Sequence, residues 1–442
     1  MSSRPRSVCR LPIRATGRWI LRYLAFATQP IKCYIGEVDP LEGSWRRKLG
    51  LEPGVAALAA GLLLFGVGQE LWSRYLPAYL RALGASALAV GAFGTLADLL
   101  DAAYAYPGGV LSDRLGSKRA LLAFGALTTM GFAVYLVWSS AAGIFLGLFF
   151  VMAWKSLGLP ATFALIGEEL AGARRTVAFT VQAILKRLPI VVAPPLGGML
   201  IERFGMARGM RTGFALSVVL SAATLVGLHL AFRRSRPLAA SGSMPSIGSR
   251  KTPLHPVLRR LLAADCLIRL CEGLPDVFLV IWALEIVRIS PARFGLLVSI
   301  QMVTSILSYL PAAALAGRAE KKPFVVVTFL FFALFPLAVV SSRSFAQLAA
   351  AYVVGGLREI GEPARKALIV DLSPSETRGR SVGAYYAVRG FAVAGAAAVG
   401  GALWTIRPSL TFFAAGLLGM LGTAWAIVFL PAHANDSLES AS

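Results

Sequence analysis

The sequence is poor in histidine, cysteine and charge, and each shortage excludes a class of protein. Only three histidines and four cysteines occur in 442 residues, and the cysteines (Cys9, Cys33, Cys266 and Cys271) lack the spacing of metal ligands. No nucleophile motif is present either, so we expect no enzyme activity, no metal site, no disulfide framework and no cofactor. Charged residues make up 15% of the chain and hydrophobic residues 57%. Because a soluble domain could not bury so much apolar surface, we expect a protein of the lipid bilayer.

The charge that is present is strongly basic, with 44 lysines and arginines against 22 acids and a formal net charge of +22. Such a surplus can indicate a nucleic-acid partner. Here the bases lie in short loops between apolar runs, where the positive-inside rule of membrane proteins accounts for them. We therefore expect no binding of nucleic acid.

Apolar runs long enough to cross about 30 Å of hydrocarbon occur repeatedly along the chain. They predict an all-α membrane protein with twelve transmembrane helices near residues 54–82, 87–110, 120–139, 142–166, 176–200, 212–232, 257–288, 292–316, 323–342, 345–371, 380–403 and 409–431. An even number of helices places both termini on one side of the membrane. Base-rich clusters at 46–48, 233–236, 250–251 and 321–322 indicate that this side is the cytoplasm. We expect the protein to lie in the plasma membrane.

Composition also divides the chain into domains. Residues 54–232 and 257–431 form two predicted six-helix bundles, and the polar segment 233–256, rich in serine and glycine, is a cytoplasmic linker between them. Residues 432–442 form a C-terminal tail. Residues 1–53 form a basic N-terminal tail that is either disordered or interfacial; a mitochondrial-type presequence and a start codon placed too far upstream are alternatives for the same composition.

The two predicted bundles repeat one sequence pattern. The segment that starts at Trp154 recurs at Leu357, and nine pairs share an offset of 203: Gly158/Gly361, Pro160/Pro363, Leu165/Leu368, Ile166/Ile369, Glu168/Asp371, Arg175/Arg378, Lys186/Arg389, Gly197/Gly400 and Gly198/Gly401. An ungapped register across two helices is difficult to obtain by chance. The halves are therefore predicted to be parallel copies related by a pseudo-twofold axis along the membrane normal.

A short charged segment joins the second and third predicted helices. It contains Gly109, Asp113, Arg114, Gly116, Lys118 and Arg119, and it resembles the signature loop of the major facilitator superfamily (MFS), G-x-x-x-D-[RK]-x-G-[RK]-[RK], with Ser117 in place of one base. Glycine permits a tight turn and a close backbone approach, and Asp113 can face the positive end of a neighbouring helix. We expect this segment to act as a gating loop.

The resemblance implies a secondary transporter that works by alternating access of two six-helix bundles to a site at the bilayer midplane. It implies a small-molecule solute and a proton or another ion as partners, and we expect a monomer. Two alternatives are a proton-antiporting exporter of drugs or amphipathic metabolites and a membrane sensor that binds a solute without transporting it. The run Ala193-Pro194-Pro195-Leu196-Gly197-Gly198 resembles only the end of the antiporter signature G-P-x-x-G-G.

Ionisable residues within the predicted helices indicate where the site lies. Each costs about 2.5–3.5 kcal/mol at the bilayer centre on insertion scales, so a large set must line a polar cavity or pair internally. Asp276 lies at the same depth in predicted helix seven. We expect the solute to contact residues of helices one, four, five, seven, ten and eleven: Glu70, Arg74, Lys155, Lys186, Arg187, Arg269, Glu272, Arg358, Glu359, Glu362 and Arg389. Lys155 and Lys186 match Arg358 and Arg389 in the repeat, which favours an anionic or zwitterionic solute held between the halves.

Two further carboxylates, Asp98 and Asp101, lie three residues apart in the second predicted helix. Two carboxylates that share a poorly solvated site disfavour the doubly charged state, so one of them can take up a proton. We expect Asp98 and Asp101 to couple transport to protons.

Overall fold

The computed structural model describes residues 53–158, 161–162, 165, 173–234, 256–316, 321–372 and 378–430, all of which belong to one compact unit of the chain. Their regular structure is helical, and no strand occurs among them. The first half contains α3 (Pro53–Glu70), η1 (Ser73–Tyr75), α4 (Leu76–Ala82), α5 (Ala87–Leu115), α6 (Ser117–Val137), α7 (Ala141–Met152), the π-helical turn η2 (Ala153–Leu157), α9 (Ala173–Phe204) and α10 (Met206–Arg234).

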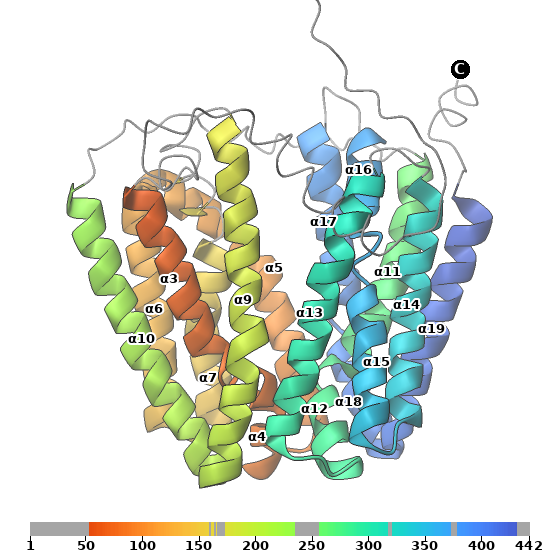
Figure 1. Ribbon diagram of the computed structural model, residues 1–442, viewed down its shortest axis with the longest axis horizontal. Helices are drawn as coiled ribbons and strands as arrows, with labels where there is room; N and C mark the ends of the chain where they lie inside the picture. Colours follow the sequence, from red (N-terminus) through yellow and green to blue (C-terminus); the bar gives the residue numbers. More distant parts are fainter. Residues whose placement is uncertain are drawn as a thin grey trace, which may run out of the picture. The chain divides into compact units, whose positions relative to one another are not determined.

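The second half contains α11 (Pro256–Asp276), α12 (Leu279–Ile281), the π-helical turn η3 (Trp282–Ile286), α13 (Pro291–Ala316), α14 (Lys321–Ser341), α15 (Phe345–Leu357), α16 (Glu362–Asp371), α17 (Arg378–Val393), α18 (Ala396–Ile406) and α19 (Pro408–Phe429) (Figure 1). Together the described elements form twelve spans, as predicted. The first, fourth, seventh, tenth and eleventh spans are interrupted, whereas the hydropathy pattern predicts each of them as one uninterrupted helix.

Local sequence signals explain where several helices begin and end. The side chains of Ser86, Ser140 and Ser344 each accept a hydrogen bond from the backbone N–H three residues later, which caps α5, α7 and α15. Gly84 and Gly116 adopt positive φ angles of 88° and 80° at opposite ends of α5. We name the two ends of the bundle after these turns, the Gly84 end and the Gly116 end.

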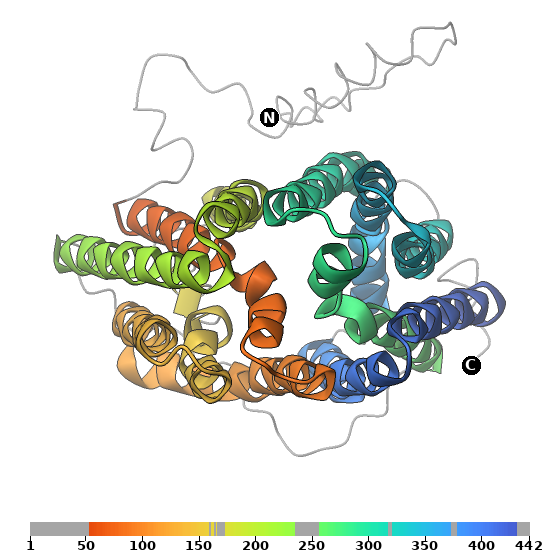
Figure 2. The same ribbon diagram turned by 90° about the horizontal axis from the view of Figure 1, so that it is seen from below.

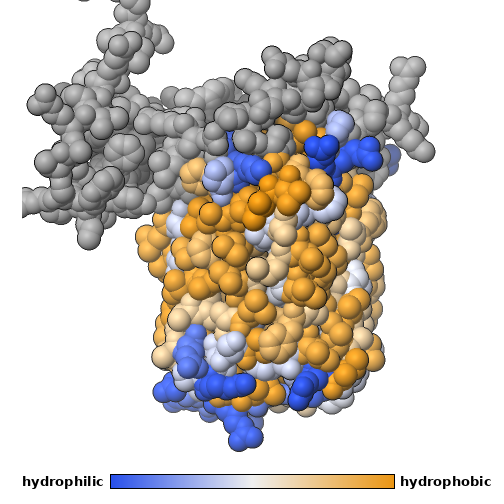
Figure 3. All heavy atoms as spheres, turned by 90° about the vertical axis from the view of Figure 1, so that its right-hand side faces the viewer, coloured by the Kyte–Doolittle hydropathy of each residue, from blue (hydrophilic) through white to orange (hydrophobic). Residues whose placement is uncertain are grey.

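The outer surface suits a lipid environment. Seven of the described helices are each long and apolar enough to cross a membrane. On the face shown in Figure 3, a broad apolar belt separates hydrophilic residues at the two ends. On α19, large apolar side chains such as Leu417 and Val428 are exposed at 62% and 69% of their surface. A surface of this kind is stable only against hydrocarbon, so the chain is an integral, multi-pass membrane protein.

The helices form a ring when viewed along the bundle (Figure 2). The two halves meet along α5 with α18 and along α9 with α13. Small residues allow these contacts, because a Cβ at Gly91 would meet the backbone of Ala397 and one at Gly295 would meet the backbone of Pro194. Close helix packing through glycine and alanine is typical of membrane proteins.

Hydrogen bonds join the halves toward the Gly84 end. The Tyr75 hydroxyl donates to the carbonyl of Pro194 at 2.7 Å and to that of Pro291, in the other half, at 3.0 Å. Pro195 has no N–H to offer the carbonyl of Val191 one turn earlier in α9, and Ser299 of α13 donates to that carbonyl instead. Pro195 thus frees a carbonyl of α9 to accept a hydrogen bond from the opposite half.

The halves separate toward the Gly116 end. Figure 1 shows α9 and α13 side by side near the Gly84 end and diverging toward the end that contains the start of α3. The bundle is therefore closed at one end and splayed at the other. The predicted boundaries of the two bundles stay a prediction, because residues 1–52, 235–255 and 431–442, which contain the tails and nearly all of the linker, lie outside the described residues.

Candidate solute-binding site

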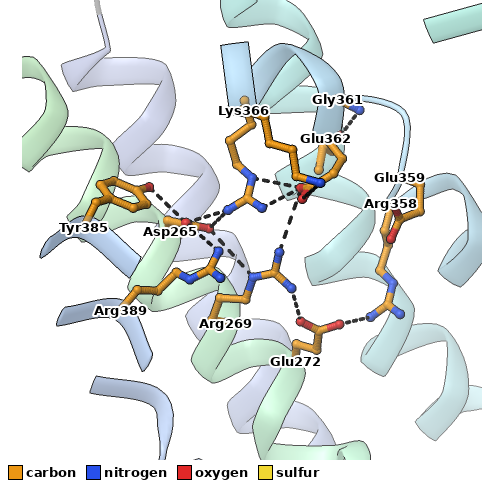
Figure 4. Close-up of polar contacts among 12 residues, drawn as sticks. Asp265, Arg269, Glu272, Arg358, Glu359, Gly361, Glu362, Lys366, Tyr385 and Arg389 are labelled. Carbon is orange, nitrogen blue, oxygen red and sulfur yellow. Dashed lines mark hydrogen bonds and ion pairs between the residues drawn. The ribbon is translucent and has the colours of Figure 1, made fainter. Parts of the chain in front are cut away.

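A dense set of ion pairs fills the second half between α11, the α15–α16 segment and α17 (Figure 4). We call it the C-terminal ion network. It consists of Asp265, Arg269, Glu272, Arg358, Glu362, Arg365, Lys366, Tyr385 and Arg389. Membrane insertion of so many ionisable side chains is possible only if they neutralise one another or meet water.

Asp265 is almost fully buried within the network, with only 1% of its side chain exposed. It accepts hydrogen bonds from the Arg365 guanidinium at 2.5 Å, the Tyr385 hydroxyl at 2.9 Å and the Arg389 guanidinium at 3.3 Å. Arg365 is itself 2% exposed. The buried carboxylate therefore ties together three helices: α11, α16 and α17.

A second branch of the network leads from Asp265 along α11 and α15. Arg269 donates to Glu272 at 2.6 Å and lies 3.9 Å from Glu362. Glu272 also lies 3.5 Å from Arg358, whose guanidinium stacks over the rings of Phe332 and Phe335. Arg358 and Glu362 lie four residues apart, a spacing that favours a local pair on one helix face. Arg358 pairs instead with Glu272, and Glu362 binds Arg365 at 2.5 Å.

The C-terminal ion network contains more positive than negative side chains. Its cations are Arg269, Arg358, Arg365, Lys366 and Arg389, and its carboxylates are Asp265, Glu272 and Glu362. The formal balance leaves a surplus of two positive charges. The network therefore attracts anions.

A second group of charges lies where the halves face each other, and we call it the central charge cluster. It consists of Glu70, Arg74, Asp98, Asp101, Lys155 and Asp276. Arg74 pairs with Glu70, four residues earlier, at 3.2 Å and also interacts with Asp276 of the other half. Asp98 interacts with Asp276 and with Lys155. Four carboxylates against two cations give this cluster the opposite sign to the C-terminal ion network.

The structure gives the two predicted proton-coupling residues different surroundings. Asp101 accepts a hydrogen bond from Ser156 on η2. Asp98 forms no hydrogen bond or ion pair with another residue in the described ranges, and its side chain is exposed. Its strongest carboxylate neighbour is Asp276 of the opposite half rather than Asp101.

The predicted pairs of cations are likewise not equivalent. Arg358 is held by Glu272 and by a hydrogen bond from its Nε to the Gly355 carbonyl at 2.8 Å, whereas Lys155 is exposed. Lys186 is also exposed. Arg187 pairs with Glu359 at 3.4 Å and so joins α9 to the segment after α15, across the two halves.

The predicted gating loop is mostly helical. α5 continues through Gly109, Asp113 and Arg114 to Leu115, and α6 already contains Lys118 and Arg119, so the turn is confined to Gly116. The predicted close backbone approach at Gly109 is wrong, because a Cβ there would meet no atom within 4 Å. It is Gly108 that makes this approach, with the Cα of Leu157 only 2.7 Å from its Cβ position. The Asp113 side chain is exposed.

Comparison with known proteins agrees with this architecture. The model of the Major Facilitator Superfamily matches the chain twice, over residues 58–271 and 261–441. The chain belongs to the major facilitator superfamily. An uncharacterized MFS-type transporter of Methanocaldococcus jannaschii is 21% identical over 385 residues, which cover 84% of this chain and 93% of the relative. The chain is therefore a membrane transporter and not an enzyme.

Solved POT transporters share the fold. A POT family transporter in complex with 5-aminolevulinic acid has a TM-score of 0.67 at 16% identity, covering 87% of this chain and 95% of that one. A peptide transporter POT in complex with sulfate has a TM-score of 0.69 at 16% identity, covering 85% of this chain and 93% of that one. The C-terminal ion network and the central charge cluster thus both lie inside the helical bundle of this fold.

Sequence reasoning missed four members of the C-terminal ion network: Asp265, Arg365, Lys366 and Tyr385. Asp265 and Arg365 lie about one helical turn outside the middle third of their predicted helices, so they are farther from the bilayer centre, where a charge is most costly. A signal was present, because Glu362 and Arg365 lie three residues apart and Tyr385 and Arg389 four apart, each pair on one helix face.

Proposed function

We propose that this MFS transporter moves a small polar solute, zwitterionic or anionic, by alternating access and couples the movement to protons. The proposal places the protein in the plasma membrane as a monomer with both termini in the cytoplasm. One observation carries it: two charged groups of opposite net sign adjoin each other, because Asp276 of the central charge cluster interacts with Glu272 and Arg358 of the C-terminal ion network. The splayed Gly116 end would then open to the cytoplasm.

The two charge groups offer complementary partners to a dipolar solute. The central charge cluster, with Asp98 and Asp276, favours an ammonium or another cationic group. The surplus of cations around Arg269 and Arg389 favours a carboxylate or phosphate. A neutral apolar solute would offer neither group a charge of the opposite sign, and this counts against an exporter of amphipathic compounds.

Proton coupling is proposed through Asp98. This carboxylate has no salt-bridge partner within the described residues, and a second carboxylate, Asp276, approaches it from the opposite half. Two facing carboxylates lower their repulsion by sharing a proton or by binding a cation. Movement of a charge across 100 mV is worth about 2.3 kcal/mol, which is enough to drive accumulation.

A counterflow assay in proteoliposomes tests the proposal. The panel would contain amino acids, dipeptides, 5-aminolevulinic acid, organic anions, sugars and cationic dyes, each with and without a pH gradient. We expect exchange of a zwitterion or an anion, with accumulation that depends on the gradient. Transport of dyes alone would support the exporter, and saturable binding without any transport would support the sensor.

Two variants connect the assay to the site. Lys155→Ala and Arg358→Ala should each weaken solute binding by roughly tenfold, which corresponds to about 1.4 kcal/mol for one charge-assisted contact. Arg343→Ala is the matched control, because Arg343 is an exposed arginine in the loop between α14 and α15. Normal affinity in both site variants would contradict a binding role for these cations.

A further inference from the structure

The fourth and tenth spans are irregular at matching positions. In the fourth span the helix changes to the π-helical turn η2 at Ala153–Leu157. In the tenth span it is interrupted at residues 358–361, between α15 and α16. The repeat offset of 203 places Lys155 on Arg358, so each irregular segment carries one of the two cations discussed above. Irregular backbone at this depth is tolerated where it lines a cavity, and paired interruptions in two halves indicate a binding site.

A buried threonine from the preceding span holds each irregular segment. In the first half, Thr128 on α6 accepts a hydrogen bond from the Trp154 N–H at 2.8 Å. In the second half, Thr328 on α14 accepts one from the Gly361 N–H at 2.5 Å. The two threonines are 0% and 1% exposed, and their numbers differ by 200, close to the repeat offset.

Thr128 also bonds both backbone groups that a regular α-helix would join at the start of η2. Its hydroxyl donates to the Phe150 carbonyl at 3.1 Å while accepting from the Trp154 N–H. Residues 150 and 154 are i, i+4 partners, so the threonine occupies both groups that a regular α-helix would join. The π-helical turn contains one more residue than an α turn, and its loss would rotate the following residues by roughly 100°.

In the tenth span a threonine also holds the irregular segment, and the backbone approach is closer. A Cβ at Gly361 would meet the carbonyl of Phe324 on α14, so only glycine allows this segment to reach Thr328. The interruption itself is tight, with the Ile360 N–H bonded to the Leu357 carbonyl three residues earlier. Without the Thr328 hydroxyl, the buried Gly361 N–H would lack its acceptor.

We propose that Thr128 and Thr328 are paired positioning residues that set the direction of Lys155 and Arg358 at the solute site, and thereby its affinity. The affinity part of this inference rests on the proposed function. The positioning part does not, because the direction of the two side chains is measurable without any solute.

Cysteine labelling measures the direction of each cation position. In a background with the four native cysteines replaced by alanine, Lys155→Cys and Arg358→Cys would be labelled in proteoliposomes with a charged methanethiosulfonate reagent. We expect Thr128→Val to change the labelling rate about tenfold at position 155 and little at position 358. Thr328→Val should have the converse effect.

Matched controls separate positioning from general loss of stability. Thr128→Ser and Thr328→Ser keep the hydroxyl and should restore the original labelling rates. Thr224 and Thr423 are also buried threonines of the two halves, but each bonds only a carbonyl of its own helix, at 2.8 Å. Their valine variants should leave both rates unchanged.

The transport readout then tests affinity. With the solute found by counterflow, Thr128→Val and Thr328→Val should raise the half-saturation concentration about tenfold, and the serine variants should restore it. Labelling changes in Thr128→Val and Thr328→Val no larger than those in the Thr224 and Thr423 variants would overturn the inference. A panel in which no solute is exchanged would contradict the proposed function alone and leave the labelling result standing.

Discussion

Removal of the Asp265 charge should destabilise the protein more than removal of any exposed charge. Asp265→Asn leaves the Arg365 guanidinium, which is 2% exposed, with Glu362 as its remaining carboxylate partner. Loss of one partner from a buried ion pair typically costs 3–5 kcal/mol. Because Glu362 stays in place, we expect about 3 kcal/mol, at the lower end of that range.

The free energy of unfolding in detergent micelles, measured by chemical denaturation, provides the test. Lys366→Met is the matched control: the lysine is 55% exposed and lies 3.4 Å from Glu362, so its loss should cost less than about 1 kcal/mol. The double variant Asp265→Leu with Arg365→Met replaces the pair by apolar side chains and should recover only part of the loss, because Tyr385 still lacks its acceptor. The reasoning is refuted if Asp265→Asn is as stable as Lys366→Met.

Three further perturbations address gating, coupling and the contact between the halves. Asp113→Asn should slow net transport severalfold in a flux assay while equilibrium binding of solute stays normal, because Asp113 lies at the helix end and away from both charge groups; unchanged flux would exclude a gating role. Asp98→Asn should keep solute exchange but lose accumulation driven by a pH gradient, and Asp101→Asn should lose less, since Ser156 already satisfies Asp101; full accumulation in both variants would argue against coupling here. Gly295→Ala should lower both stability and transport because its Cβ meets the Pro194 backbone, whereas Gly383→Ala on α17, with no atom within 4 Å, should not, as thermal unfolding and flux would show.

The spans of this fold follow closely from hydropathy, because a helix in lipid must satisfy its own backbone and needs a fixed apolar length. The interruptions do not follow from it. Residues 358–361 lie inside the predicted span 345–371, and hydropathy averaged over the span conceals one tight turn. The turn depends on a partner, Thr328, that belongs to another helix. The sequence likewise cannot distinguish Gly108 from Gly109. The two glycines are adjacent, and only the fold shows that Gly108 is the one that approaches Leu157.

The site is predictable in its residue types and depth but not in its pairing. The position of a charged residue along its predicted span identifies Arg269, Glu272 and Arg358, because a charge near the midplane is costly in any direction and is kept only at a polar site. Which acid each arginine meets depends on helix rotation, and a rotation of one residue moves a side chain by about 100°. This explains why Arg358 meets Glu272 rather than Glu362, and why Asp98 faces Asp276 of the other half.

Pro195 in α9 affects the free energy needed to separate the two halves during transport. The carbonyl of Val191 has no donor in its own helix, because Pro195 stands one turn later, and Ser299 of the opposite half supplies the hydrogen bond. If the halves part at the Gly84 end, as alternating access requires, this carbonyl loses its donor within the membrane. Water must then enter to solvate it, since an unsatisfied backbone group in hydrocarbon costs several kcal/mol. Entry of water at this contact is thus a condition for opening at that end.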